Sequence, residues 1–503
     1  MRNQRGAGFV LSYISIFISS VVGILFTPYM ISTLGQVEYG LYQLLYAAIG
    51  YISLLDFGLG STLTRFILKY RAEGNKEKIN TVITMCVKIY SIFGLVAFLL
   101  VWIVSLNLDV LFKETITSEN IEYARQLFLI MGVTTSISLV SHALTGVQTA
   151  HEKYIVTKGI YIARQLFRVV IMVILLQLNI GALAVVYADF VITVLIVVFD
   201  ILYCKYVLKT PIINGRWDNA LLKTLFSFSF FVFLQIIITQ VNVGIDKLVL
   251  GRYSCLEYVA LYGVVSQIYN LFNSIGNVVC SVTLPKISQV VFANSSVEET
   301  TDCCVKYSRL QLHILAPLIG GFIILGKNFA SLWAPQYDSM SIYIVALLTI
   351  TPQILESVEG TIFNVMKAKN LQATRSILLL GVAVVHIVLS VGLTQVFPLY
   401  GTAIGSCISF VLGNNILSNI YYHKKVGVNM FRYFKNLFKG ILPAWIIALA
   451  IGMFVNIIPL GSWLGFVIKG CIYVAIYGVC VLLIGLDKSE KQMLNGILKK
   501  IRR

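Results

Sequence analysis

The sequence predicts an all-α polytopic membrane protein, and its composition, its apolar runs and the charges between them all support this class. Of its 503 residues, 58% are hydrophobic and only 12% are charged, and the mean hydropathy is +0.85. A soluble domain of this composition would expose large apolar patches, whereas a bilayer solvates each apolar run of roughly 20 residues by itself. Lipid is therefore the expected surrounding of most side chains.

Apolar runs that are long enough to cross a bilayer predict about fourteen transmembrane helices. Their expected ranges are 8–31, 40–62, 82–105, 123–148, 156–178, 181–204, 222–245, 257–283, 309–327, 340–364, 374–395, 399–422, 440–458 and 462–486. Arg2 and Arg5 precede the first run, as in a signal peptide, but this run is long and lacks a clear small-residue cleavage site. We expect it to remain as the first span.

Basic residues collect in every second link between the predicted spans. Lys76 and Lys78 follow the second span, and Lys424 and Lys425 follow the twelfth, whereas the link at Pro398 carries no charge. Loops rich in Lys and Arg stay in the cytoplasm, so both termini are predicted to be cytoplasmic. The net charge of +17 is then explained without a nucleic-acid partner.

An internal repeat divides the predicted spans. The segment Glu38-Tyr39-Gly40-Leu41-Tyr42 opens the second span, and a similar segment from Glu257 to Tyr262 opens the eighth. Because six intervening spans preserve orientation, the halves are expected to be parallel repeats. The predicted domains are a six-helix lobe in 1–215, a second six-helix lobe in 216–435, and two additional helices with a basic tail in 436–503.

Polar amides follow one face of two predicted spans. Gln267, Asn270 and Asn277 recur at helical spacing on the eighth span, as do Gln235 and Asn242 on the seventh. Polar groups lack partners among lipid tails, so these faces should turn inward. Two interpretations stay open, because such residues either hydrogen-bond neighbouring helices together or line a water-filled cavity that binds substrate.

Charged groups inside a span need a reason, because each costs roughly 2.5–3.5 kcal/mol at mid-membrane. Three carboxylates within predicted spans, Asp56, Asp189 and Glu356, are candidates for coupling transport to protons or sodium. Four basic residues lie toward the cytoplasmic ends of spans: Arg65, Arg164, Arg168 and Lys286. They either extend to lipid headgroups or, as a cationic cavity mouth, bind a pyrophosphate.

Motifs of several enzyme classes are absent from the sequence. It contains no G-x-x-x-x-G-K-[ST] segment to bind a nucleotide and no H-E-x-x-H pair to bind zinc. No large loop interrupts the spans to form an external catalytic domain. We therefore expect a protein that is not an enzyme, hydrolyses no ATP, and holds neither a cofactor nor a metal.

The first two predicted spans and the residues just after them contain the segments Pro28-Tyr29-Met30, Leu34-Gly35, Asp56-Phe57-Gly58-Leu59-Gly60 and Thr64-Arg65. These motifs resemble those of the polysaccharide transporter family of lipid-linked oligosaccharide flippases, which belongs to the MOP superfamily with the MATE exporters. The resemblance implies a protein of the cytoplasmic membrane of a bacterium. The resemblance implies a MATE-like, V-shaped pair of lobes that works by alternating access. One feature departs from related lipid flippases, since neither the first nor the seventh span has a central arginine.

The implied function is translocation of polyprenyl-pyrophosphate-linked oligosaccharide repeat units, coupled to an ion gradient or the membrane potential. The lipid-linked glycan, membrane lipids and a proton or sodium ion are the expected partners, and glycan polymerase or assembly proteins are candidate ones. A MATE-type cation or drug antiporter is the alternative, although few acids lie inside the spans. A glycan polymerase or ligase would need a large external loop, which the sequence lacks.

Overall fold

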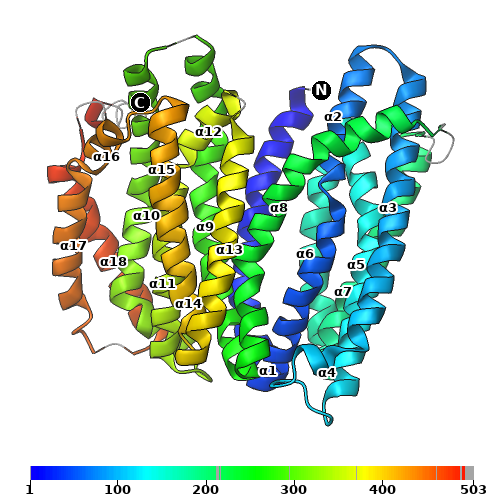
Figure 1. The fold of residues 1–503 in the computed structure, drawn as a ribbon. Coiled ribbons are helices and arrows are strands. Elements are labelled where there is room, and N and C mark those ends of the chain that lie inside the picture. Colours follow the sequence, from blue (N-terminus) through cyan, green and yellow to red (C-terminus); the bar gives the residue numbers. More distant parts are fainter. Residues whose placement is uncertain are drawn as a thin grey trace. The chain divides into compact units, whose positions relative to one another are not determined.

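The computed structural model is built of helices and describes residues 2–210, 215, 217–293, 295–369, 371–459, 461–487 and 490–492 (Figure 1). One compact unit comprises Met1–Gln267 and Ala383–Gly405, and the other comprises Ile268–Val382 and Ser406–Arg503. The helices within the first unit are α1 (Arg2–Ile52), η1 (Ser53–Asp56), α2 (Leu59–Ala72), α3 (Lys76–Ser105), α4 (Leu108–Leu111), α5 (Ile121–Ala150), α6 (Tyr154–Leu176), α7 (Leu183–Leu202), η2 (Tyr203–Val207) and α8 (Asn219–Tyr253). Those within the second are α10 (Val297–Trp333), α11 (Ser339–Val358), α12 (Gly360–Ala368), η3 (Val411–Leu417), α15 (Ser418–Tyr421), η4 (Tyr422–Val426), α16 (Met430–Phe438), α17 (Ile441–Val455), α18 (Trp463–Cys480) and η5 (Val481–Gly485).

Three helices continue along the chain from one unit into the other. They are α9 (Leu256–Phe292), α13 (Gln372–Val396) and α14 (Gly401–Phe410). The first unit includes α8 and the start of α9 as well as the N-terminal helices. The boundary between the units therefore differs from that between the lobes expected at 1–215 and 216–435. Those lobes follow the internal repeat and stay a prediction.

Long apolar helices confirm the all-α polytopic class. Within the described residues, eleven helices are long and apolar enough to cross a membrane, or up to twelve if the bent pair α16 and α17 forms one span. The run Leu11–Ala72 alone covers two of the predicted spans, and α9, which covers the predicted eighth span, is not among the eleven. The number of about fourteen spans therefore stays a prediction.

A glycine joins the two predicted spans inside α1. Gly35 has φ 75° and ψ 173°, a non-helical conformation that divides α1 into two helical parts. Residues with a Cβ reach this region only with strain, because it is essentially limited to glycine. The Leu34-Gly35 segment therefore acts as the link between the first two predicted spans.

Each unit has its own apolar core. In the first unit α5 packs against α2, α3 and α7 (Figure 1), and Leu63, Ile83 and Leu144 are buried between these helices. In the second, α17 and α18 pack against α10 around Ala444 and Tyr473. The outward apolar side chains of the described helices have no such partners within the protein, and a hydrocarbon environment suits them.

A buried arginine holds two helix ends in the second unit. Arg309 of α10 is 2% exposed and donates hydrogen bonds to the Glu490 carboxylate at 2.8 and 2.7 Å. Its guanidinium also donates to four backbone carbonyls at 2.8–3.3 Å, those of Asn436, Leu437, Lys439 and Gly485. The last carbonyls of a helix have no partner within it, so Arg309 caps both α16 and η5. Burial alone would raise the pKa of Glu490, but the His313 imidazole 3.4 Å away and the hydrogen bonds from Arg309 outweigh it and lower this pKa.

Candidate functional site

The second predicted span is broken at its polar segment. After the short turn of η1, Phe57 and Gly58 adopt left-handed conformations with φ 49° and 67°, and α2 begins at Leu59. A Cβ at Gly58 would lie 2.4 Å from Cγ1 of Val232 on α8, so the chain approaches α8 closely here. In membrane proteins such breaks are tolerated where the backbone is covered by protein or lines a water-filled cavity.

Replacing Gly58 with alanine is expected to reduce the amount of folded protein. Alanine strains the left-handed backbone by about 1 kcal/mol, and its Cβ also forces Val232 to move. The matched control is Gly159→Ala, because a Cβ at this helical position meets no atom within 4 Å. Thermal unfolding in detergent should show a lower melting temperature for Gly58→Ala and an unchanged or higher one for Gly159→Ala. Equal melting temperatures would contradict the role of Gly58.

Asp56 lies at this break and contacts two ionisable side chains from other helices. Tyr90 of α3 donates a hydrogen bond to Oδ1 of Asp56 at 2.5 Å, and Nδ1 of His142 on α5 lies 3.2 Å from the same oxygen. The Asp56 side chain is 23% exposed and that of His142 is 49% exposed. Carboxylates and histidines within membrane spans are typical members of proton relays in transporters, so this pair is a candidate coupling site.

A second pair of a carboxylate and a histidine lies deeper in the same unit. Oδ1 of Asp246 on α8 is 3.1 Å from Nε2 of His386 on α13, and Ser390 donates to the same oxygen at 3.4 Å. The neighbouring Lys247 is also buried and donates to Oε1 of Gln43 at 2.9 Å. Asp246 lies about one helical turn after Asn242, so this end of the polar face of the seventh predicted span contacts α13 within the protein.

The two other predicted coupling carboxylates each form an ion pair with an arginine. Nε and Nη2 of Arg168 on α6 donate to the two oxygens of Asp189 on α7 at 2.5 and 2.9 Å. Glu356 of α11 accepts from Arg375 at 2.9 Å and from Asn414 at 2.7 Å. An arginine keeps its charge throughout the accessible pH range, so each of these carboxylates has a permanent cationic partner.

The other predicted basic residues make few interactions. Arg65 of α2 is exposed, and its guanidinium carbon lies 4.2 Å from the centre of the Phe228 ring. Lys286 of α9 is exposed, and Arg164 of α6 is half-buried. Exposed cations of this kind are available to lipid headgroups or to an anionic ligand, so both sequence interpretations stay open.

The predicted polar faces occupy different environments. Gln235 and Asn242 are half-buried on α8, and Asn270 on α9 is exposed. Gln267 is half-buried on α9, where a Cβ at Gly23 of α1 would meet its Oε1 at 3.1 Å, so α1 and α9 approach each other at this amide. The side chain of Asn277 lies outside the described residues.

Sequence reasoning missed the partners of these carboxylates. His142, Tyr90 and Arg375 were not among the predicted site residues, although each lies within a long helix. The sequence does contain a feature that could have identified His142 and Arg375. Each is an ionisable residue inside an apolar run, where its insertion costs free energy. The partners themselves lie far away in sequence, since Asp56 and His142 are 86 positions apart.

The described helices and the charged pairs between them define an all-α multi-pass membrane protein. The chain belongs to the polysaccharide biosynthesis protein family, whose model matches residues 6–291. A relative from Bacillus subtilis (strain 168), the uncharacterized membrane protein EpsK, is 23% identical over 97% of this chain and 96% of its own length. These findings confirm the family predicted from the motifs.

Solved structures of two kinds share the fold. The lipid II flippase MurJ in its inward closed conformation matches with a TM-score of 0.73 at 16% identity, over 95% of this chain and 98% of that one. An inward-facing multidrug resistance MATE transporter of the MOP superfamily matches with a TM-score of 0.61 at 13% identity, over 82% of this chain and 94% of that one. The chain therefore shares the fold of these two solved transporters.

Proposed function

We propose that this protein flips polyprenyl-pyrophosphate-linked oligosaccharide repeat units from the cytoplasmic to the outer leaflet by ion-coupled alternating access. The proposal rests mainly on one observation, the likeness of almost the whole chain to the lipid II flippase MurJ, with 95% of the chain covered. Membership of the polysaccharide biosynthesis protein family supports a glycan as the cargo. A lipid-linked glycan is a substrate that agrees both with the likeness to a lipid flippase and with the polysaccharide family.

The finer architecture belongs to the same proposal. It has about fourteen spans, two six-helix lobes in 1–215 and 216–435 arranged as a V, two more helices in 436–503, and both termini in the cytoplasm. The kink at Gly35 within the run Leu11–Ala72 supports two spans there. Loop charges support the orientation, because basic residues collect in alternate links.

Among the predicted coupling carboxylates, Asp56 is the one that the contacts favour. Asp189 and Glu356 are each bridged by an arginine, whereas the ionisable partners of Asp56 are a histidine and a tyrosine. A histidine changes its charge between about pH 5 and 8, which an arginine does not. A proton is therefore the coupling ion that we propose, with Asp56 and His142 as its site.

Purified protein in liposomes tests the proposed function. A fluorescent polyprenyl-pyrophosphate-linked oligosaccharide is placed in one leaflet, and its appearance in the other leaflet is followed with an impermeant quencher or a glycan-cleaving enzyme. Flipping that depends on the protein, and that accelerates under a proton gradient, is expected. Absence of flipping under proton and sodium gradients and under a membrane potential would overturn the proposal.

The cationic mouth of the cavity is tested by changing two residues together. Arg65→Ala with Lys286→Ala should slow flipping by about tenfold and leave abundance intact, because lost charge-assisted bonds to pyrophosphate cost about 1.5 kcal/mol or more. The control is Lys69→Ala with Lys424→Ala, which removes two other exposed lysines. Equal loss of abundance and of transport in the Arg65 and Lys286 variant would instead favour a role at lipid headgroups.

A MATE-type cation or drug antiporter is the second candidate, favoured by the fold shared with multidrug transporters. It predicts that expression protects cells against cationic dyes and that dye efflux follows an ion gradient. The flippase predicts that loss of the gene leaves single repeat units on the cytoplasmic leaflet. The two measurements separate the candidates.

A further inference from the structure

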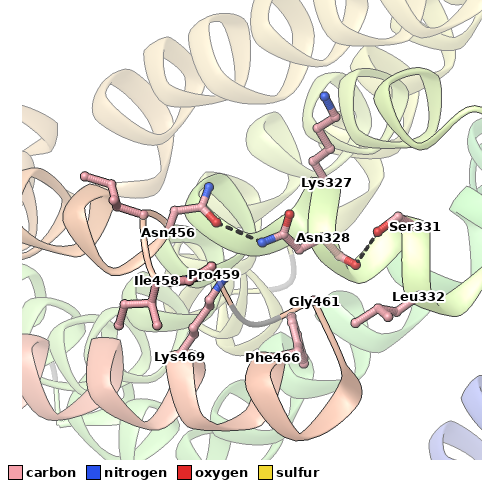
Figure 2. A pocket seen from close by; sticks show the side chains of 11 residues that line it. Lys327, Asn328, Ser331, Leu332, Asn456, Ile458, Pro459, Gly461, Phe466 and Lys469 are labelled. Atoms are coloured by element: carbon pink, nitrogen blue, oxygen red, sulfur yellow. Dashed lines mark hydrogen bonds between the residues drawn. The ribbon is translucent and has the colours of Figure 1, made fainter.

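A pocket of about 490 Å³ lies between the end of α10 and the connection from α17 to α18 (Figure 2). Two lysines line it, Lys327 from α10 and Lys469 from α18, together with the amides of Asn328 and Asn456. None of its eleven described lining residues is acidic. The pocket thus combines positive charge and amide groups without a carboxylate to balance them.

Lys469 is the informative residue of this pocket. It is 3% exposed, and among the described residues it forms no hydrogen bond and no ion pair. Its side chain is thus nearly covered by the protein, but its ammonium has no partner in the described part of the chain, and an anion in the pocket would supply one. The arrangement is therefore one that an anionic ligand would complete.

The amides are fixed in place by their own contacts. Nδ2 of Asn328 donates to Oδ1 of Asn456 at 2.8 Å, as Figure 2 shows, and Nδ2 of Asn456 lies 3.3 Å from the carbonyl oxygen of Ile324, to which it donates. These contacts join the end of α10 to the end of α17. The pocket therefore has a preformed polar wall.

The pocket lies at the expected depth of lipid headgroups. Phe329 packs against Trp333, Trp463 and Phe466 with ring centres 5.3–6.1 Å apart, and Phe466 also lines the pocket. Tryptophans gather where membrane helices meet the headgroups, and α17 ends and α18 begins beside this cluster. Ile457, which is 73% exposed, adds an apolar edge that acyl chains can cover.

We propose that this pocket binds the phosphate of an anionic membrane lipid, with Lys469 as its buried cation. Lys327 and the amides add hydrogen-bond donors suited to phosphate oxygens, and the aromatic and apolar edge suits the glycerol and the start of the acyl chains. By the loop charges this headgroup belongs to the outer leaflet. The site needs no glycan and stands apart from the proposed function.

Native mass spectrometry of the full-length protein tests this site. Delipidated protein is mixed with phosphatidylglycerol or phosphatidylcholine, and retained lipid is counted. We expect retention of phosphatidylglycerol to fall about tenfold in Lys469→Met, because the loss of one charged hydrogen bond accounts for a change of this size. Retention should persist in Lys469→Arg, because arginine keeps the positive charge. Lys113→Met, which removes a lysine with a 64% exposed side chain outside the pocket, is the control and should retain the lipid.

Folding is checked separately, by the melting temperature of each variant without added lipid. Asn456→Asp is a second variant that introduces a negative charge into the pocket, and it should also weaken phosphatidylglycerol binding. Phosphatidylglycerol should raise the melting temperature of the wild type but not of Lys469→Met. Equal retention by folded Lys469→Met and wild type would overturn the site. Stabilisation by inorganic phosphate without preference between the two lipids would overturn its assignment to a lipid.

Discussion

Arg309→Met should cause the largest loss of stability among single substitutions in the second unit. The substitution leaves four backbone carbonyls without their donor and the Glu490 carboxylate without its cation. Breaking a buried pair from one side costs about 3–5 kcal/mol, because the remaining group stays away from water. Thermal unfolding in detergent should show a melting temperature lower by roughly 5 °C or more.

An arginine pair elsewhere in the same unit provides the matched control. Arg432 binds both oxygens of Asp302 at 2.9 and 2.6 Å, but the two side chains are 42% and 48% exposed. Exposed pairs contribute about 1 kcal/mol or less, so Arg432→Met should barely change the melting temperature. Arg309→Lys should fall between the two, because lysine keeps the charge but lacks the planar fork. Equal melting temperatures of Arg309→Met and Arg432→Met would contradict the capping role of Arg309.

The observed helix ends show which part of each helix hydropathy can predict. The spans predicted at 82–105 and 181–204 correspond to α3 and α7, because their apolar runs are nearly as long as the helices themselves. The span predicted at 309–327 is only part of α10, which begins at Val297. A Ser296 capping box with Glu299 starts that helix outside the apolar run. Hydropathy detects where a helix is apolar, not where it begins.

Contacts between helices were less predictable than the helices. Periodicity places a residue on one face of its own helix but does not identify the helix that it faces. Arg168 and Asp189 were predicted in separate roles, as a cavity cation and a coupling acid, and the structure pairs them. The partner of Asp56 on α5 was likewise absent from the sequence analysis. Tertiary packing alone decides such pairs.

Asp56→Asn should strongly reduce proton-driven transport with little change in folding. Asparagine keeps the Oδ1 acceptor for Tyr90 but removes the negative charge beside His142. If this pair shares the coupling proton, removing the Asp56 charge removes a coupling free energy of about 1–3 kcal/mol. This corresponds to a loss of roughly 5- to 150-fold in the transport rate. Flipping in liposomes with an imposed proton gradient, normalised to folded protein, measures the effect.

Asp200→Asn is the control from the same unit that separates coupling from structure. Asp200 is buried and accepts hydrogen bonds from Ser141 at 2.6 Å and Gln148 at 2.7 Å, which are neutral donors. Its loss should lower stability by about 1–3 kcal/mol, because a donor loses its acceptor, yet leave transport per folded molecule unchanged. His142→Gln should flatten the dependence of transport on pH, since glutamine cannot be protonated as a histidine can. Full proton-driven transport by Asp56→Asn would remove Asp56 from the coupling site.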